Sequence, residues 1–390
     1  MNKNGFNLIS VIIIICVTSI ISAITSGVII TNNYGLSYKA VAEDENLNNF
    51  LNAYTNIIDN YYEDIDKEKM LDAAVNGMLN YLGDNYTTYL NSEQSRELEK
   101  RLAGSYEGIG ITLQGQTIVG LAENGPAFKS GIEVGDILNK VDDKDVSTLS
   151  SQAISVMITS NKKKKVKLTV TRNEEIIEKE VNIESIPISS VEEKMLENNI
   201  GYMQISIFSK NLTEQVKESL KSLKEQGMEK LIIDLRNNTG GYLDSAEGTA
   251  SLFLKKGSKI YSLEDKKKTE DYFDKTENYE TMPIAIIVNN NTASAAEILA
   301  TALKDSYNAT IIGEKSFGKG KVQQTYDLSD GSKAKYTSAK WLRPNGECID
   351  TIGITPDIEA SLTYEYDENG NEIATIDSQL STAVEYISAK

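Results

Sequence analysis

The sequence predicts an α/β protein with a small β-rich insertion, a helical region in front of it and an apolar N-terminal segment. Three observations lead to this fold class. In residues 187–390, short apolar strands alternate with helical patterns, which is typical of a sheet covered by helices on both faces. Residues 104–186 instead carry short β-branched runs separated by glycine-containing turns. Residues 7–30 contain no charged side chain.

The run at residues 7–30 is long enough to cross a membrane as a helix. About 20 apolar residues span a hydrocarbon core of ~30 Å, whereas the apolar part of a cleaved signal peptide has about 7–15 residues. The length therefore favours an uncleaved anchor over a cleaved signal peptide. Lys3 and Lys39 flank the run and specify its orientation only weakly. Because the bulk of the chain follows the run, we expect an exported globular part.

Periodicity predicts the elements of the three remaining regions. Region 46–103 is expected to be helical, with Asp66 placed to cap its second helix. In region 104–186 the pattern predicts strands at 109–113, 117–121, 137–141 and 166–172, and a helix at 150–159. In region 187–390 it predicts strands at 202–208, 231–235, 284–288 and 309–313, and helices at 211–226, 244–254, 294–303 and 377–387.

Composition excludes several classes of function. The net charge of −17 argues against a nucleic-acid-binding protein, which would present a basic face. The chain contains no histidine, so a Ser-His-Asp triad, a Cys-His pair and a His-bound zinc are all excluded. A nucleophilic hydrolase would need another base, for which lysine is the main candidate. The two cysteines, Cys16 and Cys348, give no evidence of an internal disulfide.

Ser294 is the first candidate for chemistry. It lies at the junction of a predicted buried strand and a helix, where the helix dipole and free N–H groups stabilise a developing anion. Small alanines on both sides would let a substrate backbone approach closely. Ser294 and Glu297 also have the spacing of an ordinary N-terminal capping box. On this stretch alone, capping is the better interpretation.

Two further segments follow neighbouring predicted strands. Lys319 lies between Gly318 and Gly320, and a desolvated lysine there would have a depressed pKa and could accept a proton from a serine. The alternative is an exposed turn lysine, which is the commoner fate of this residue type. Gly240 and Gly241 could present main-chain N–H groups to an oxyanion, or they could simply form a strand-to-helix turn.

The chain resembles the carboxyl-terminal processing peptidases, also called tail-specific proteases, from about Phe50 to its end. The resemblance rests on four ordered segments, Asp234–Gly241, Thr292–Glu297, Phe317–Gln323 and Pro344–Ile358. It implies that Ser294 is the nucleophile and Lys319 the base, with Gln323 orienting the lysine amine. It further implies an oxyanion hole made of the main-chain N–H groups of Gly240, Gly241 and Ala295. The implied fold of residues 187–390 is a crotonase/ClpP-like peptidase core.

The β-rich region 104–186 resembles a PDZ domain. Its segment Tyr106–Ile111 is similar to the carboxylate-binding loop of that module, which implies peptide-binding residues at Gly108, Ile109, Gly110 and Ile111. Successive N–H groups of such a loop capture the C-terminus of a peptide that is added as a strand. PDZ folds also serve as inert spacers, but the resemblance favours a domain that binds the substrate tail and gates activity.

The function expected from this resemblance is that of a serine endopeptidase that cleaves protein substrates near their C-termini through an acyl-enzyme. No metal or organic cofactor is implied. The resemblance and the run at 7–30 together imply a single-pass protein of the bacterial cell membrane with its catalytic part outside the cytoplasm. The resemblance also implies a homodimer through the helical segment 46–100. The main alternative is a membrane scaffold that binds C-terminal tails through its PDZ domain without cutting. A crotonase-like acyl-transfer enzyme is disfavoured because it would not need the PDZ-like insertion.

Overall fold

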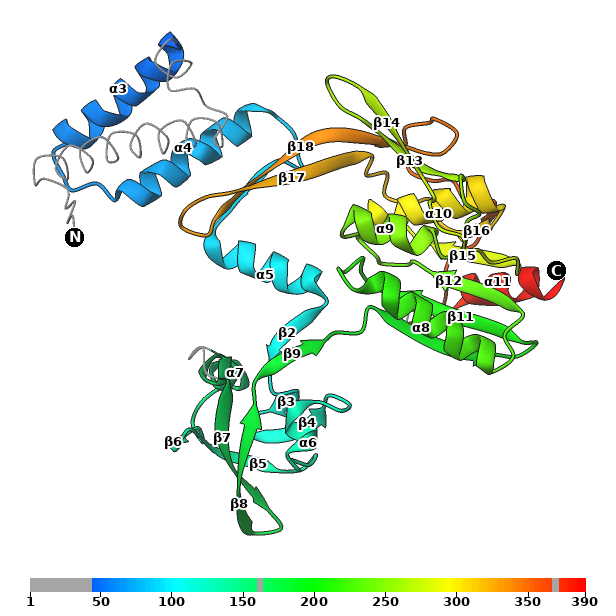
Figure 1. Cartoon of the computed structure of the whole chain (residues 1–390), viewed down its shortest axis with the longest axis horizontal. Coiled ribbons are helices and arrows are strands. Elements are labelled where there is room, and N and C mark those ends of the chain that lie inside the picture. The colour runs from blue at the N-terminus through cyan, green and yellow to red at the C-terminus, as the bar shows by residue number, and fades with distance from the viewer. Residues whose placement is uncertain (1–43, 160–163, 367–371) are drawn as a thin grey trace, which may run out of the picture. The chain divides into compact units, whose positions relative to one another are not determined.

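The computed structural model describes residues 44–159, 164–366 and 372–390. The chain divides into two compact units, residues 1–77 and 78–390 (Figure 1). The predicted membrane segment, residues 7–30, lies outside the described residues. Within the described ranges, no helix combines the length and the apolar character that crossing a membrane requires.

The N-terminal unit contains α3 (Glu45–Asn60) and most of α4 (Lys67–Tyr81). The side chain of Asp44 accepts a hydrogen bond from the main-chain N–H of Leu47, which caps α3. Asp66 accepts from the N–H of Lys69 at 3.1 Å, so the predicted cap of α4 is confirmed. No side chain of α3 is buried. Its apolar side chains Phe50, Leu51 and Ile57 are each nearly half exposed.

The β-rich module follows α5 (Ser92–Ala103) and is framed by a ribbon of β2 (Ser105–Gly108) and β9 (Glu184–Pro187). Its sheet consists of β3 (Ile111–Gln114), β4 (Thr117–Leu121), β5 (Ile137–Val141), β6 (Lys144–Asp145), β7 (Lys165–Arg172) and β8 (Glu175–Asn182). Two helices, α6 (Pro126–Lys129) and α7 (Ser151–Thr159), complete the module. The strand predicted at 109–113 starts at Ile111 because Gly110 has a φ of 78°, which interrupts the extended backbone.

The main sheet of the C-terminal region has six strands in the order β10-β11-β12-β15-β16-β19. The strands are β10 (Val191–Leu196), β11 (Ile200–Ile205), β12 (Lys230–Asp234), β15 (Ile284–Val288), β16 (Thr310–Gly313) and β19 (Ile358–Glu359). β10 is antiparallel to β11, and the other neighbours pair in parallel. The strand predicted at 202–208 ends at Ile205, and Phe208 pairs instead with Gly241 in an isolated parallel bridge.

Helices cover both faces of this sheet. Leu231 and Ile233 of β12 pack in one cluster with α8 (Leu212–Glu225), α9 (Leu243–Ala250) and α10 (Ala295–Tyr307). Ile232, between them, packs in a second cluster with Ala383 and Ile387 of α11 (Ser378–Ser388). Alternate residues of a strand point to opposite faces, which explains this division. The predicted α/β core is therefore confirmed, whereas its finer likeness to crotonase and ClpP folds stays a prediction.

A second, antiparallel sheet was not anticipated from the sequence. It contains β17 (Lys321–Asp327), β18 (Lys333–Leu342), β13 (Lys259–Glu264), β14 (Thr269–Phe273) and β1 (Thr88–Leu90). Figure 1 shows β17 and β18 as a long ribbon. Trp341 of β18 is fully buried and belongs to the cluster under α10. A short hairpin of β20 (Thr363–Tyr366) and β21 (Glu372–Ile376) precedes α11.

The parallel register brings three loops to one edge of the main sheet. β12, β15 and β16 are immediate neighbours, so their carboxyl ends lie side by side. In open α/β sheets, ligands bind outside the carboxyl ends of the strands. The loops that leave these ends contain the Gly240, Ser294 and Lys319 segments, respectively.

Candidate active site

Ser294 occupies a strained turn between β15 and α10. Its φ of 59° and ψ of −121° lie outside the extended region that an ordinary N-cap residue adopts. Non-glycine residues in such conformations cost about 1–3 kcal/mol and persist only where the surrounding structure holds them. Sharp strand-to-helix turns of this kind expose the nucleophile in α/β-hydrolases. The backbone therefore distinguishes Ser294 from a simple cap, which the sequence pattern could not do.

Glu297 is the group that holds this turn. Its side chain is fully buried, and its Oε2 accepts the main-chain N–H groups of Ser294 at 2.8 Å and Lys319 at 2.9 Å. Its Oε1 accepts the Ser316 hydroxyl at 2.6 Å and the Gly318 N–H at 2.7 Å. Burial raises the pKa of Glu297, and the four hydrogen bonds oppose that rise. One carboxylate thus joins the Ser294 turn to the Lys319 loop.

Lys319 is partly buried, and its ammonium nitrogen lies 5.1 Å from the ring centre of Tyr86. Within the described part of the chain, Nζ makes neither a hydrogen bond nor an ion pair. Burial lowers the pKa of Lys319, the nearby charge of Lys335 lowers it further, and the carboxylates of Glu297 and Asp84 oppose this effect. This direction is the one that the predicted role of Lys319 requires.

The main chain around Lys319 is fixed from both sides. Trp341 Nε1 donates to the carbonyl oxygen of Lys319 at 2.8 Å. Gly318 has a φ of 85°, which favours glycine. At Gly320 an added Cβ would lie 2.6 Å from the Cβ of Asp350. The glycines on both sides of Lys319 are thus required by backbone conformation and by close packing.

Asp84 ties the loop before β1 to the ribbon that follows Lys319. Its carboxylate accepts hydrogen bonds from Thr87 and Thr337 and pairs with the ammonium of Lys321 at 3.2 Å. Partial burial opposes ionisation, but these contacts depress the pKa of Asp84 to about 2. Tyr86, two residues later, lies under both Lys319 and Lys321.

The glycine loop after β12 lies directly against Ser294. A Cβ added to Gly240 would lie 2.9 Å from the nitrogen of Ala295 and from the Cβ of Ser294. The N–H of Gly240, however, donates to the side-chain oxygen of buried Asn238 at 2.9 Å. Among the described residues, the N–H groups of Ala295 and Gly241 have no hydrogen-bond acceptor. In the described residues, the N–H groups of Ala295 and Gly241 are therefore available to bind an oxyanion, whereas the N–H of Gly240 already donates to Asn238 in the same loop.

Polar side chains anchor this loop to its surroundings. Asn237 and Asn289 exchange hydrogen bonds of 2.9 and 3.0 Å, which joins the loops after β12 and β15. At the base of the loop, Arg236 contacts the carboxylates of buried Asp234 and of Asp377, the latter through two hydrogen bonds of 2.7 and 2.8 Å. These bonds hold the glycines at a defined distance from Ser294.

Gln323 does not contact the lysine amine in this structure. Its side-chain nitrogen donates to Thr337 on the paired strand β18 at 3.3 Å. The orienting role predicted for Gln323 therefore stays a prediction. A change of side-chain rotamer would be needed to bring its amide to Lys319 Nζ.

The predicted catalytic residues line one cleft with a volume of about 470 Å³. Ser294, Lys319, Gln323, Gly240 and Gly241 all contribute to its wall. The remaining lining comes from α5, from the start of α9 and from the β17–β18 ribbon. No group of three or more Cys, Asp or Glu side chains in the described residues is arranged to hold a metal ion. The sequence-predicted segments are thus brought together in one place.

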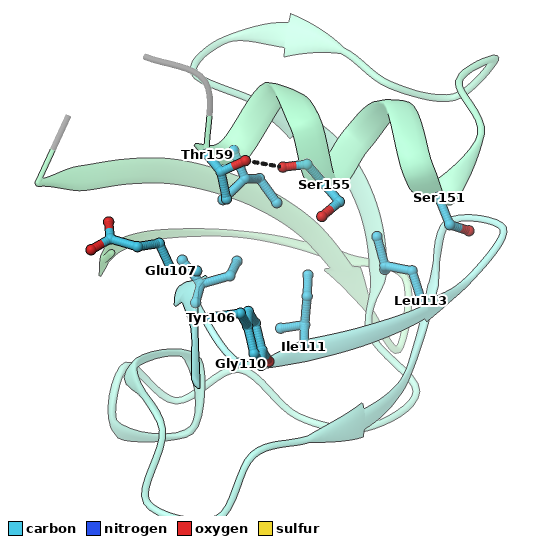
Figure 2. Close-up of a pocket in the computed structure, with 11 residues that line it drawn as sticks. Tyr106, Glu107, Gly110, Ile111, Leu113, Ser151, Ser155 and Thr159 are labelled. Atoms are coloured by element: carbon cyan, nitrogen blue, oxygen red, sulfur yellow. Dashed lines mark hydrogen bonds between the residues drawn. The ribbon is translucent and has the colours of Figure 1, made fainter. Parts of the chain in front are cut away.

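A second, smaller pocket of about 110 Å³ lies in the β-rich module. All four residues predicted to bind peptide, Gly108, Ile109, Gly110 and Ile111, line it. Figure 2 shows Ile111 and Leu113 on one side of the pocket and Ser151, Ser155 and Thr159 of α7 on the other. A groove between a strand and a helix suits an extended peptide that adds to the strand edge.

Sequence reasoning missed several residues that shape the active-site cleft. Glu297 was recognised only as half of a capping box, and its partners in the Lys319 loop are 19 to 22 residues away. Asp84 and Tyr86 precede Ser294 and Lys319 by more than 200 residues, and nothing in their local pattern distinguishes them. Asn238 lies inside a segment that the family resemblance covers, but its bond to Gly240 depends on a turn that periodicity does not predict.

Comparison with known proteins identifies the family. Residues 199–360 match peptidase family S41, residues 94–183 match the PDZ domain, and residues 29–94 match the N-terminal domain of the activating protease CtpB. The carboxy-terminal processing protease CtpA of Bacillus subtilis (strain 168) is 35% identical over 356 residues, which cover 90% of this chain and 76% of that protein. A CtpA-like serine protease of Staphylococcus aureus (strain N315) is 33% identical over 353 residues, covering 89% and 71%.

A solved structure agrees at the level of fold. The lipoprotein from Streptococcus agalactiae superposes with a TM-score of 0.50 and 16% identity, over 89% of this chain and 90% of that one. The chain belongs to the carboxy-terminal processing proteases of peptidase family S41. It is a serine-type peptidase with an internal PDZ domain.

Proposed function

We propose that this peptidase cuts protein substrates near their C-termini with Ser294 as nucleophile and Lys319 as general base. The observation that carries the proposal is the Glu297 carboxylate, which binds the main-chain N–H groups of both residues. Their side chains also line the same cleft. The burial that lowers the pKa of Lys319 favours the neutral amine, which is the form that can accept a proton.

The proposed reaction has two stages. The amine of Lys319 takes the hydroxyl proton of Ser294, and Oγ attacks the substrate carbonyl carbon. The oxyanion lies near the N–H groups of Ala295 and Gly241, and Gly240 joins them when Asn238 releases its N–H. The peptide C–N bond breaks as the lysine ammonium returns its proton to the leaving amine. Water then hydrolyses the acyl-enzyme by the same route.

The experiment that tests the dyad compares Ser294→Ala and Lys319→Ala with the wild type on an unfolded protein substrate. Both variants should lose cleavage while circular dichroism and thermal unfolding stay close to the wild type. Lys340→Ala is the matched control, because Lys340 is an exposed lysine on β18 outside the cleft. Full activity in either dyad variant would contradict the assignment. Loss of activity in both would also exclude the non-cutting scaffold, which the family membership already disfavours.

The PDZ domain is proposed to bind the substrate tail and to raise activity at the cleft. A Cβ added to Gly110 would lie 2.9 Å from the Cβ of Ala122, so Gly110→Ala should distort the peptide-binding loop. Gly115→Ala is the control, since Gly115 also has a positive φ but has open space around its Cα. Gly110→Ala should weaken binding of a C-terminal peptide and slow cleavage of the substrate that carries it. Equal behaviour of the two variants would argue against the gating role.

The proposed enzyme is anchored in the bacterial cell membrane by residues 7–30, with its catalytic part outside the cytoplasm. The support is the absence of charge over a length that spans a bilayer. Carbonate washing of membranes should leave the protein in the pellet, and protease added to intact, wall-stripped cells should digest its catalytic part. Recovery of the full-length chain in the soluble fraction would contradict the anchor.

Self-association through α3 is also proposed. The helix buries none of its side chains in the described unit, although its apolar residues recur at helical spacing. Unpartnered apolar faces of this kind mark interaction sites. Sedimentation equilibrium of the wild type and of Ile57→Asp should give a dimer and a monomer, respectively. A monomeric wild type would refute this part of the proposal.

A further inference from the structure

The active-site cleft is basic although the whole chain is strongly acidic. Five of its lining side chains carry positive charge, namely Arg101, Lys319, Lys321, Lys333 and Lys335, against two carboxylates, Glu99 and Asp244. Two of these have carboxylate partners in the protein. Lys321 pairs with Asp84 at 3.2 Å, and Lys333 pairs with Glu99 at 2.8 Å. Lys319 is the proposed base. Arg101 and Lys335 are the two remaining cations, and neither a carboxylate partner nor a role in the proposed reaction accounts for their place in the cleft.

Arg101 and Lys335 have no counter-ion among the residues that the structure describes. In the described ranges, no carboxylate forms an ion pair or a hydrogen bond with either side chain. Lys335 is only partly exposed, and its pKa is lowered first by burial and then by the charge of Arg101. Two like charges that face one space, one of them partly removed from water, destabilise the empty cleft. An anion between them would remove this repulsion.

The two cations reach the cleft from different elements, Arg101 from α5 and Lys335 from β18. Arg101 shares one face of α5 with Leu98 and Leu102, which line the cleft at helical spacing. Lys335 pairs with Thr325 across the β17–β18 ribbon, two residues further along than the pair of Gln323 and Thr337. Two residues of strand correspond to about 7 Å. Lys335 therefore lies about two strand residues from Gln323 on the wall that Ser294 and Lys319 also line, within reach of a side chain of an extended peptide in this cleft.

We propose that Arg101 and Lys335 form a subsite for an acidic side chain of the substrate close to the cleaved bond. The inference rests on the proposed function, because it needs a peptide in this cleft. A carboxylate supplies the missing counter-ion, with the guanidinium able to bind it through two hydrogen bonds and the ammonium acting as a point charge. The terminal carboxylate of a substrate has the same chemistry, but the PDZ loop is already proposed to hold that group.

The test measures kcat/KM for pairs of peptides that differ in one carboxylate. In the first set, Asp is exchanged for Asn at each of three positions on both sides of the cleaved bond. In the second set, the peptide ends in a free carboxylate or in an amide. Each pair is measured with the wild type, with Lys335→Met and with Arg101→Gln. Lys340→Met serves as the control, since it removes an exposed lysine of the same strand.

The wild type should cleave the Asp peptide about tenfold faster than the Asn peptide at one position, as expected for a partly buried charge pair. In Lys335→Met and Arg101→Gln this ratio should fall towards one, and in Lys340→Met it should stay at the wild-type value. Because a ratio is measured, a general change in activity does not affect the result. Arg101 is exposed, so its substitution leaves the fold intact even where that of Lys335 does not.

Two outcomes would overturn the inference. Ratios that are equal in all four proteins would show that no such subsite exists. An effect confined to the acid and amide termini would show that the terminal carboxylate, and not a side chain, is the ligand. Failure of the proposed function is distinguishable, because Ser294→Ala would then retain cleavage of every peptide. If Ser294→Ala is inactive and the ratios do not respond, only the subsite is wrong.

Discussion

Replacing Glu297 with glutamine tests whether one carboxylate holds the dyad together. The carboxylate accepts four hydrogen bonds, whereas an amide offers a single oxygen and a donor in place of the second. The favoured orientation keeps the oxygen towards Ser294 and Lys319. The amide NH₂ then meets Ser316, whose hydroxyl can turn to accept, and Gly318, whose N–H cannot.

The expected loss of stability follows from these contacts. The buried N–H of Gly318 would be left without an acceptor, which costs about 1–3 kcal/mol. The bonds from the N–H groups of Ser294 and Lys319 would go to a neutral amide oxygen instead of a carboxylate, which costs about 1 kcal/mol each. Removal of a buried charge, whose burial raises the pKa of Glu297, offsets part of this sum. A net destabilisation of about 2 kcal/mol lowers the midpoint of thermal unfolding by roughly 4–8 °C for a region of this size.

Activity should fall by more than stability explains. The Gly318 bond positions the residue just before the proposed base Lys319, and a misplacement of about 1 Å can reduce a rate about 100-fold. The assay combines thermal unfolding with cleavage of a fluorogenic peptide at 25 °C, where the variant remains folded. Glu218→Gln is the control, because Glu218 is exposed on α8. A Glu297→Gln protein that matched this control in both measurements would refute the role of the carboxylate.

Three further predictions concern the same cleft. The rate of cleavage should rise with pH as Lys319 loses its proton. Lys335→Met should shift this rise to higher pH, because the charge of Lys335 helps to lower the pKa of Lys319. A shift to lower pH would contradict the proposed role of Lys319. Asp84→Asn should lower the free energy of unfolding in urea by about 2 kcal/mol at pH 7. Because the pKa of Asp84 is depressed to about 2, its contribution to the free energy of unfolding is complete above about pH 4 and is lost as the pH falls through 2. The stabilities of the wild type and of Asp84→Asn should therefore converge in acid. A difference in stability that does not change with pH would refute this explanation. Gly241→Ala should abolish activity, because the added Cβ would lie 2.2 Å from the main-chain oxygen of Phe208. Gly257→Ala is the control, since Gly257 also has a positive φ but has open space around it, and it should keep its activity. Equal effects of the two substitutions would exclude the steric explanation.

The sequence predicted the parallel core because its strands are short, apolar and separated by helices of the right length. The strand at 284–288 was predicted with its observed bounds, since Pro283 and three asparagines delimit a run of apolar residues. The β17–β18 ribbon was missed. Its strands carry lysine, threonine and glutamine on a polar face that lines the cleft, and such a face shows no clear apolar alternation.

The proposed catalytic pair was found by resemblance, and local pattern alone would have missed it. Ser294 has the spacing of a cap, and only its backbone conformation separates it from one. Lys319 contacts Tyr86, which is distant in sequence, and its carbonyl oxygen accepts a hydrogen bond from Trp341 of the β17–β18 ribbon, which was not predicted. The role of Glu297 could not be anticipated either, because a carboxylate at the third helical position is ordinary until its partners are known.

The Glu297 carboxylate also has a consequence for how the enzyme changes state. Because it binds main-chain amides on both sides of the cleft, the Ser294 turn and the Lys319 loop should move as one rigid body. Hydrogen–deuterium exchange at the amides of Ser294, Gly318 and Lys319 should therefore be slow, and equally slow with and without a bound peptide. A switch between inactive and active forms would then involve the side chains of Lys319 and Gln323 and the glycine loop, while the Ser294 turn and the Lys319 loop keep their relative position. An inhibitor that locks that loop would stop the enzyme without contacting the nucleophile.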